Sequence, residues 1–378
     1  MRDAYAGGRQ ITVDILRGYF ILNMASAHVG IGLATSILRG WRWVDGATGF
    51  VCLAGFVMAL SQRAKWERGD GSAAHRWILK RALQIWLISF MLTFFGLSLR
   101  VLEPNLTFLA DVFHEDRLLA AVVDVATLRL NVPYFGILRM YVWFMLFAFA
   151  AVALLRRDLD WVVLAASTTL YLLTQLNDAN PAWGWGALPY GQGMFAVTAW
   201  QFIFFVGLVV GWRWKELLLP LAQRWRRGLW LTAAIAVAGF LWLAHGYKLA
   251  VLAPFHPGDA STYFDKTNLS PALLAYFVCV LGLLTALVTV LRRFRIFDPV
   301  LNLVALIGRH SLACYVITCI VQGLSWVVAV ASDPHQGKHT LWFALAVALF
   351  VLYGLSVERH RRSTRSAAPP GAIVPREG

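Results

Sequence analysis

An aspartate, an arginine and a histidine interrupt the first long apolar segment of the chain. Asp14, Arg17 and His28 lie within residues 11–32, a run long enough to span a bilayer. On a helix, Arg17 and His28 share one face about 16 Å apart along the axis, and Asp14 precedes Arg17 by about one turn. Ionisable groups in hydrocarbon cost at least a few kcal/mol, so they usually mark a pathway or a reaction site. Histidine has an ordinary pKa suited to a general base near neutral pH.

A structural role is the alternative for the same residues. Arg17 would then reach the lipid head groups with Asp14 as its neighbour, and His28 would be a hydrogen-bonded interfacial histidine. Three ionisable groups on one stripe favour the functional interpretation over this one.

The composition predicts the kind of fold that positions these residues. Of the 378 residues, 59% are apolar and 14% are charged, and the mean hydropathy is +0.62. This leaves too little polar surface for a soluble domain and predicts an all-α, polytopic bundle in the lipid bilayer. The net charge of +14 comes from clusters between apolar runs, which indicates membrane topology rather than a nucleic-acid partner. The four cysteines lie in apolar segments without ligand spacing, so we expect no disulfide framework and no metal.

Apolar runs of about 17 to 25 residues predict about ten transmembrane helices. These are 12–31, 45–62, 77–99, 134–155, 160–177, 195–213, 229–247, 271–291, 301–331 and 340–357. Basic residues are abundant in alternate connections, so an even number of spans places both termini in the cytoplasm. The first run lacks a cleavage site and is expected to be retained. We expect one domain over 1–357 and a disordered, basic cytoplasmic tail over 358–378.

Polar residues at the helix ends are further candidates. Asp45 opens the second expected helix, where it either caps the helix or orients the imidazole of His28. Arg76, Lys80 and Arg81 enter the third expected helix from the inner side, where they would hold the phosphates of a coenzyme or simply anchor the helix.

The GRHSL stretch of the ninth expected helix is also polar at its inner end. His310 and Ser311 are first interpreted as residues that start a helix, and second as contributors to a site.

The sequence resembles a known family of membrane enzymes. Arg17 and His28 form the R-x10-H arrangement of the acyltransferase-3 class of membrane O-acyltransferases. More specifically, the chain resembles the OpgC family, which transfers succinyl groups to osmoregulated periplasmic glucans. The similar stretches are DILRGYFILNM..AH (14–28), VDGATGFVCLAGF (44–56), RWILKRALQIWL (76–87), PYFGILRMY (133–141), AWQFIFFVGLVVGW (199–212), FDKTNLSPALLAYF (264–277) and LIGRHSLACYV (306–316).

The resemblance implies a donor, an acceptor and roles for the first-helix residues. The donor would be a cytoplasmic acyl-CoA, succinyl-CoA first and acetyl-CoA as the alternative, and the acceptor a hydroxyl of a periplasmic or cell-surface glycan. The protein would lie in the bacterial inner membrane. His28 would be the general base with Asp45 as its orienting partner, and Arg17, held by Asp14, would meet an anionic part of the donor. Tyr263, Lys266, Trp200 and Tyr141 are the residues expected to bind substrate.

The chain also departs from the family pattern. Thr48 replaces an acidic residue, and Gly136 and Arg139 stand where the family tends to have an acid and a proline. Two rival functions remain open, and the departures favour the second of them. One is a transporter or translocator of a glycan or small anion, for which intramembrane charges are equally typical, and the other is a non-catalytic member of the family.

Overall fold

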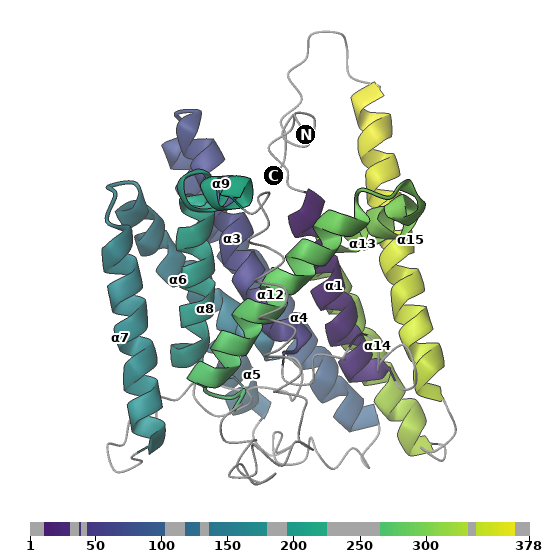
Figure 1. Cartoon of the computed structure of the whole chain (residues 1–378). Helices are drawn as coiled ribbons and strands as arrows, with labels where there is room; N and C mark the ends of the chain where they lie inside the picture. The colour runs from purple at the N-terminus through teal and green to yellow at the C-terminus, as the bar shows by residue number, and fades with distance from the viewer. Residues whose placement is uncertain are drawn as a thin grey trace, which may run out of the picture.

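The protein is helical wherever its structure is described. The computed structural model describes residues 11–30, 38, 44–102, 118–128, 136–179, 195–224, 265–331 and 338–366. Its elements are α1 (Ile11–Val29), α3 (Gly46–Glu67), α4 (Gly71–Leu102), α5 (Leu118–Ala126), α6 (Ile137–Leu155), α7 (Asp160–Ala179), α8 (Val197–Trp212), α9 (Trp214–Arg224), α12 (Pro271–Leu291), the 3-10 helix η8 (Arg295–Phe297), α13 (Asp298–Arg309), α14 (Ser311–Ala331) and α15 (Lys338–Ser366). The expected all-α class is confirmed for these residues (Figure 1).

Six helices are long and apolar enough to cross a bilayer. They are α3, α4, α6, α12, α14 and α15, and each overlaps an expected span. Helices α1 and α7 and the 16-residue apolar helix α8 occupy three more of the expected segments. The remaining segment, 229–247, lies outside the described residues. The chain is therefore a helical membrane protein, while the count of ten and the cytoplasmic position of both termini stay predictions.

The expected single helix over 301–331 is wrong, because the chain breaks at His310. This residue has φ −108° and ψ 26°, and its N–H bonds to the Ile307 carbonyl instead of the carbonyl four residues back. Helix α13 ends there and α14 begins at Ser311. The C-terminal helix differs from the expectation in the other direction: α15 continues to Ser366, so residues 358–366 of the expected tail are helical.

Small residues bring α3 and α8 into close contact. A Cβ atom at Gly207 would lie 2.2 Å from the Cys52 carbonyl oxygen, and one at Gly55 would lie 2.1 Å from the Phe204 carbonyl oxygen. The two backbones therefore touch in a way that only glycine permits. Such contacts drive helix association in lipid, where burial of apolar surface contributes little.

The ends of α3, α8 and α12, where arginines lie, meet at one end of the bundle, which we call the basic end. Arg63, near the end of α3, donates to the Trp212 carbonyl at the end of α8. Arg292, at the end of α12, donates to the Thr12 hydroxyl in the first turn of α1 across 3.2 Å. In Figure 1 these ends lie at the top of the bundle. These arginine-bearing helix ends therefore lie together, while the orientation of this end in the membrane stays a prediction.

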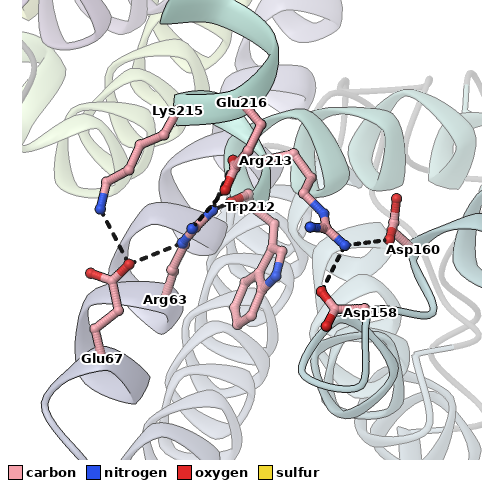
Figure 2. A network of polar contacts seen from close by, with 8 residues as sticks. All are labelled: Arg63, Glu67, Asp158, Asp160, Trp212, Arg213, Lys215 and Glu216. Carbon is pink, nitrogen blue, oxygen red and sulfur yellow. Dashed lines mark hydrogen bonds and ion pairs between the residues drawn. The ribbon is translucent and has the colours of Figure 1, made fainter.

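An ionic network ties α3, α7, α8 and α9 together at the basic end (Figure 2). Arg63 pairs with Glu67 at 3.1 Å and with Glu216 at 2.9 Å, and Lys215 reaches the same Glu67 at 3.2 Å. Arg213 pairs separately with Asp158 and Asp160, both at 2.8 Å.

Candidate functional site

The polar residues of α1 contact the α13–α14 break. The Arg17 Nη2 atom donates to the Ser311 hydroxyl at 2.5 Å, and Asp14 lies 4.0 Å from the Arg309 guanidinium. Asp14 is buried, with a relative exposure of 5%. The backbones of Asp14 and Gly308 lie so close together that a Cβ atom at Gly308 would be 1.8 Å from the Asp14 carbonyl oxygen. The break at His310 therefore lets two consecutive helix ends present polar groups to α1. Ser311 begins a helix, as expected, and contacts Arg17, while a role of GRHSL in a functional site stays a prediction.

Tyr141, on α6, interacts with the same arginine. Its hydroxyl is buried and lacks a hydrogen-bond partner within the described parts of the chain, and it interacts electrostatically with Arg17. Its ring is fixed edge-on against the rings of Phe50, Phe144 and Phe204, with centroids 5.6, 5.8 and 6.3 Å away. Two residues assigned separately from the sequence, Arg17 and Tyr141, therefore interact electrostatically.

A second polar cluster lies at the opposite end of the bundle, around the turn Asp265–Ser270, and we call this the turn end. The carboxylate of Asp265 accepts the backbone N–H groups of Thr267 at 3.0 Å and Asn268 at 3.1 Å, which folds the turn. The indole N–H of Trp200 donates to the carbonyl of Lys266 at 3.1 Å. Trp200 is fully buried, so the structure shows it holding the turn, and its expected contact with substrate stays a prediction.

Lys266 extends from this turn to Asp45 and forms an ion pair with it. The other Asp45 oxygen accepts the N–H of Thr48 at 3.1 Å and its hydroxyl at 3.0 Å, so Asp45 also caps α3. Burial raises the pKa of Asp45, but the charge and hydrogen bond of Lys266 and the two Thr48 donors outweigh it, and the pKa lies below its ordinary value. Asp45 is therefore an ionised partner of Lys266, and its expected contact with His28 stays a prediction.

His28 lies near the same end of the bundle. A Cβ at Gly46 would lie 2.7 Å from the backbone nitrogen of Met24, so the start of α3 packs directly against α1 at that level. His28 follows Met24 by one helical turn, about 6 Å. The Asp45 and Lys266 pair thus lies at the same end of the bundle as His28, whereas Arg17 lies toward the basic end.

The three cations expected to hold coenzyme phosphates differ in exposure. Arg76 and Lys80 are exposed on α4, on the side of the helix that also exposes Leu83. Arg81 is half-buried and donates to the Gln84 side chain at 2.8 Å. Exposure beside apolar residues fits the anchoring alternative for Arg76 and Lys80, and the phosphate role of all three stays a prediction.

Two other cations at the basic end make contacts that were not predicted from the sequence. Lys65 lies 4.1 Å above the ring of Trp77, and Arg156 lies 4.5 Å above the ring of Trp66 and 3.0 Å from Nδ1 of His75. In the sequence they are ordinary members of basic connections, and only the packing of α3, α4 and α6 distinguishes them.

The family departures lie at structurally defined positions. Thr48 is fully buried against Asp45, and Gly136 precedes α6. Arg139 is buried at 6% exposure and directs Nη1 to the Leu128 carbonyl at 3.4 Å. Tyr263 lies outside the described residues. Within the described ranges, no group of three or more histidine, cysteine or acidic side chains could hold a metal ion.

Comparison with known proteins gives one match. A family described as "OpgC protein" matches residues 9–362, nearly the whole chain from α1 into α15. Neither the curated proteins nor the solved structures include a match.

Proposed function

Because the chain belongs to the OpgC family, we propose that it moves an acyl group from acyl-CoA to a hydroxyl of a periplasmic or cell-surface glycan. Membership in the family indicates a membrane acyltransferase-type role in glucan modification. The finer proposal adds succinyl as the first choice of acyl group, acetyl as the second, the bacterial inner membrane as the location and His28 as the general base.

The observation that supports this proposal most directly is the polar face of α1 inside a membrane bundle. Arg17 is held by Ser311 toward the basic end, and His28 lies about 16 Å farther along the same helix. If the basic end faces the cytoplasm, as the positive-inside rule indicates, a donor entering there would meet Arg17 first and reach His28 with its acyl end. The glycan would approach from the turn end.

The reaction itself requires one proton acceptor. The glycan hydroxyl oxygen attacks the thioester carbonyl carbon, the new ester bond forms, and the carbon–sulfur bond to coenzyme A breaks. His28 takes the hydroxyl proton as the oxygen attacks and returns it to the departing thiolate, so no proton is gained or lost overall. Arg17 binds an anionic part of the donor, Arg76, Lys80 and Arg81 bind its phosphates, and Lys266 with Tyr263 binds acceptor or donor carboxylate.

Acyl transfer in reconstituted membranes tests the proposal. Purified protein receives labelled succinyl-CoA or acetyl-CoA together with periplasmic glucan, and His28→Ala is compared with His360→Ala, which removes an exposed histidine of α15. We expect labelled glucan from the wild type and from His360→Ala but not from His28→Ala. No labelled glucan with either donor would refute the transferase, and movement of unmodified glucan across the membrane would then identify a transporter.

A further inference from the structure

The connection between α12 and α13 is exposed along its whole length. Residues 292–300 read RRFRIFDPV, and every one of them is exposed. Ile296 is 81% exposed and Phe294 54% exposed, although both are large and apolar. Arginines alternate with these side chains, so the segment presents charge and apolar surface together.

Its position is at the edge of the membrane. Helix α12, Pro271–Leu291, is one of the six candidate spans, and Arg292 follows it directly. The connection lies at the basic end, where Arg292 donates to Thr12 of α1. Exposed apolar residues at such a level face the boundary between lipid head groups and acyl chains.

The arginines of this segment differ from three other arginines at the basic end, which form ion pairs. Arg63, Arg213 and Arg309 each pair with one or two carboxylates. Arg293 and Arg295, by contrast, have no ion pair within the described ranges, and the segment 292–300 contains one acid, Asp298. The carboxylates that pair with those three arginines do not pair with the two arginines of this segment, so the segment carries a net positive charge.

We propose that the α12–α13 connection is a binding site for an anionic phospholipid. The guanidinium groups of Arg293 and Arg295 bind the headgroup phosphate, and Phe294 and Ile296 insert beside the acyl chains. A planar guanidinium is well suited to a phosphate, and basic residues next to a membrane surface attract acidic lipids. A soluble anion would use the arginines alone and would leave the two apolar side chains in water.

The proposed lipid site is also linked to α1 through its neighbouring residues. Arg292 joins the end of α12 to Thr12, and the connection leads into α13, whose Gly308 packs against the backbone of Asp14. The site thus adjoins the helix that carries Arg17 and His28. The proposal does not depend on the acyltransferase function, because binding of lipid can be measured without turnover.

Lipid titration of the full chain tests the site. Detergent-purified protein is titrated with phosphatidylglycerol or phosphatidylcholine, and bound lipid is counted by native mass spectrometry. The double variant Arg293→Gln/Arg295→Gln is compared with Arg68→Gln/Arg157→Gln, which removes two exposed arginines elsewhere at the basic end. We expect phosphatidylglycerol affinity to fall about fivefold for each arginine lost from the connection and to stay near wild type in the control pair.

Three results would overturn the site. They are equal losses in the two double variants, equal binding of phosphatidylcholine and phosphatidylglycerol by the wild type, and equal competition by soluble glycerol phosphate at the lipid's concentration. A further variant, Phe294→Ser/Ile296→Ser, keeps the arginines and is expected to weaken lipid binding without creating a preference for glycerol phosphate. Thermal melting in the absence of lipid is the control that tests whether each variant is folded.

Discussion

Arg17 donates a hydrogen bond to Ser311 across 294 positions of sequence, at a distance of 2.5 Å. This contact joins the middle of α1 to the first residue of α14. Ser311 directly follows the break at His310, so the contact lies where α13 ends and α14 begins. The arginine that the proposed mechanism assigns to the donor is therefore oriented by a serine that itself need not touch the donor.

Removing the Ser311 hydroxyl should weaken donor binding more than the chemical step. A hydrogen bond to a charged group contributes about 1.5–3 kcal/mol, so we expect Ser311→Ala to raise the KM for acyl-CoA about tenfold or more, with a smaller change in kcat. Steady-state acyl transfer measures both constants. Ser311→Thr keeps a hydroxyl and should recover most of the affinity.

The matched control for this prediction is Ser325→Ala in the same helix. Ser325 is also buried, and its hydroxyl bonds to the Gln322 carbonyl of its own helix. The two serine-to-alanine variants should differ in KM. Equal KM values would mean that Ser311 does not position Arg17.

The Lys266 and Asp45 pair should behave as a coupled unit. Lys266→Met leaves the ionised Asp45 carboxylate without its partner, and Asp45→Asn leaves the ammonium unpaired while asparagine still caps α3. Because both side chains are partly exposed, we expect a coupling of only about 1 kcal/mol. Thermal melting of the two single variants and the double variant measures it. Strictly additive losses would show that the pair contributes nothing to stability.

Acid should weaken the contact between α3 and α9. The hydrogen bond from Arg63 holds the pKa of Glu216 below its ordinary value, although burial opposes the shift. A carboxyl group with a lowered folded-state pKa stabilises the protein above its unfolded-state pKa, near 4.5, and loses that contribution as pH falls through the folded-state value. The melting temperature of wild type should therefore exceed that of Glu216→Gln at pH 7, and the difference should shrink below about pH 4.

Asp70→Asn provides the comparison, because Asp70 is exposed and precedes α4 outside the ionic network. Its melting curve should follow that of wild type at both pH values. A gap between wild type and Glu216→Gln that is constant across the pH range would contradict the proposed role of the Arg63 pair.

The expected helices and their polar residues followed from local properties of the sequence. Long apolar runs require helices in lipid, since every backbone polar group must be satisfied within the segment, and the basic connections mark one end of the bundle. The stripe of Asp14, Arg17 and His28 needed only helical periodicity. The start of α3 could also be predicted from local sequence, because Asp45 caps the helix through Thr48, three residues away.

The partners of these residues depend on tertiary packing and were not predictable in the same way. No periodicity connects Arg17 with Ser311 or Lys266 with Asp45. The break at His310 was missed because the apolar run continues through it, and the backbone turn is visible only in the structure. Lys65 was missed for the opposite reason: its sequence context is that of any anchoring lysine, and the ring of Trp77 beside it comes from another helix.

Two glycine-to-alanine substitutions should separate close packing from helix propensity. At Gly207 a Cβ would lie 2.2 Å from the Cys52 carbonyl oxygen, whereas at Gly282 of α12 it would meet no atom within 4 Å. Alanine favours a helix over glycine by about 1 kcal/mol, so Gly282→Ala should leave the melting temperature unchanged or raise it. Gly207→Ala gains the same helix propensity but forces α8 away from α3. We therefore expect its melting temperature to be several degrees lower than that of wild type. If the two variants had the same melting temperature, α3 and α8 would not be held at backbone contact, and α8 would be free to move relative to α3.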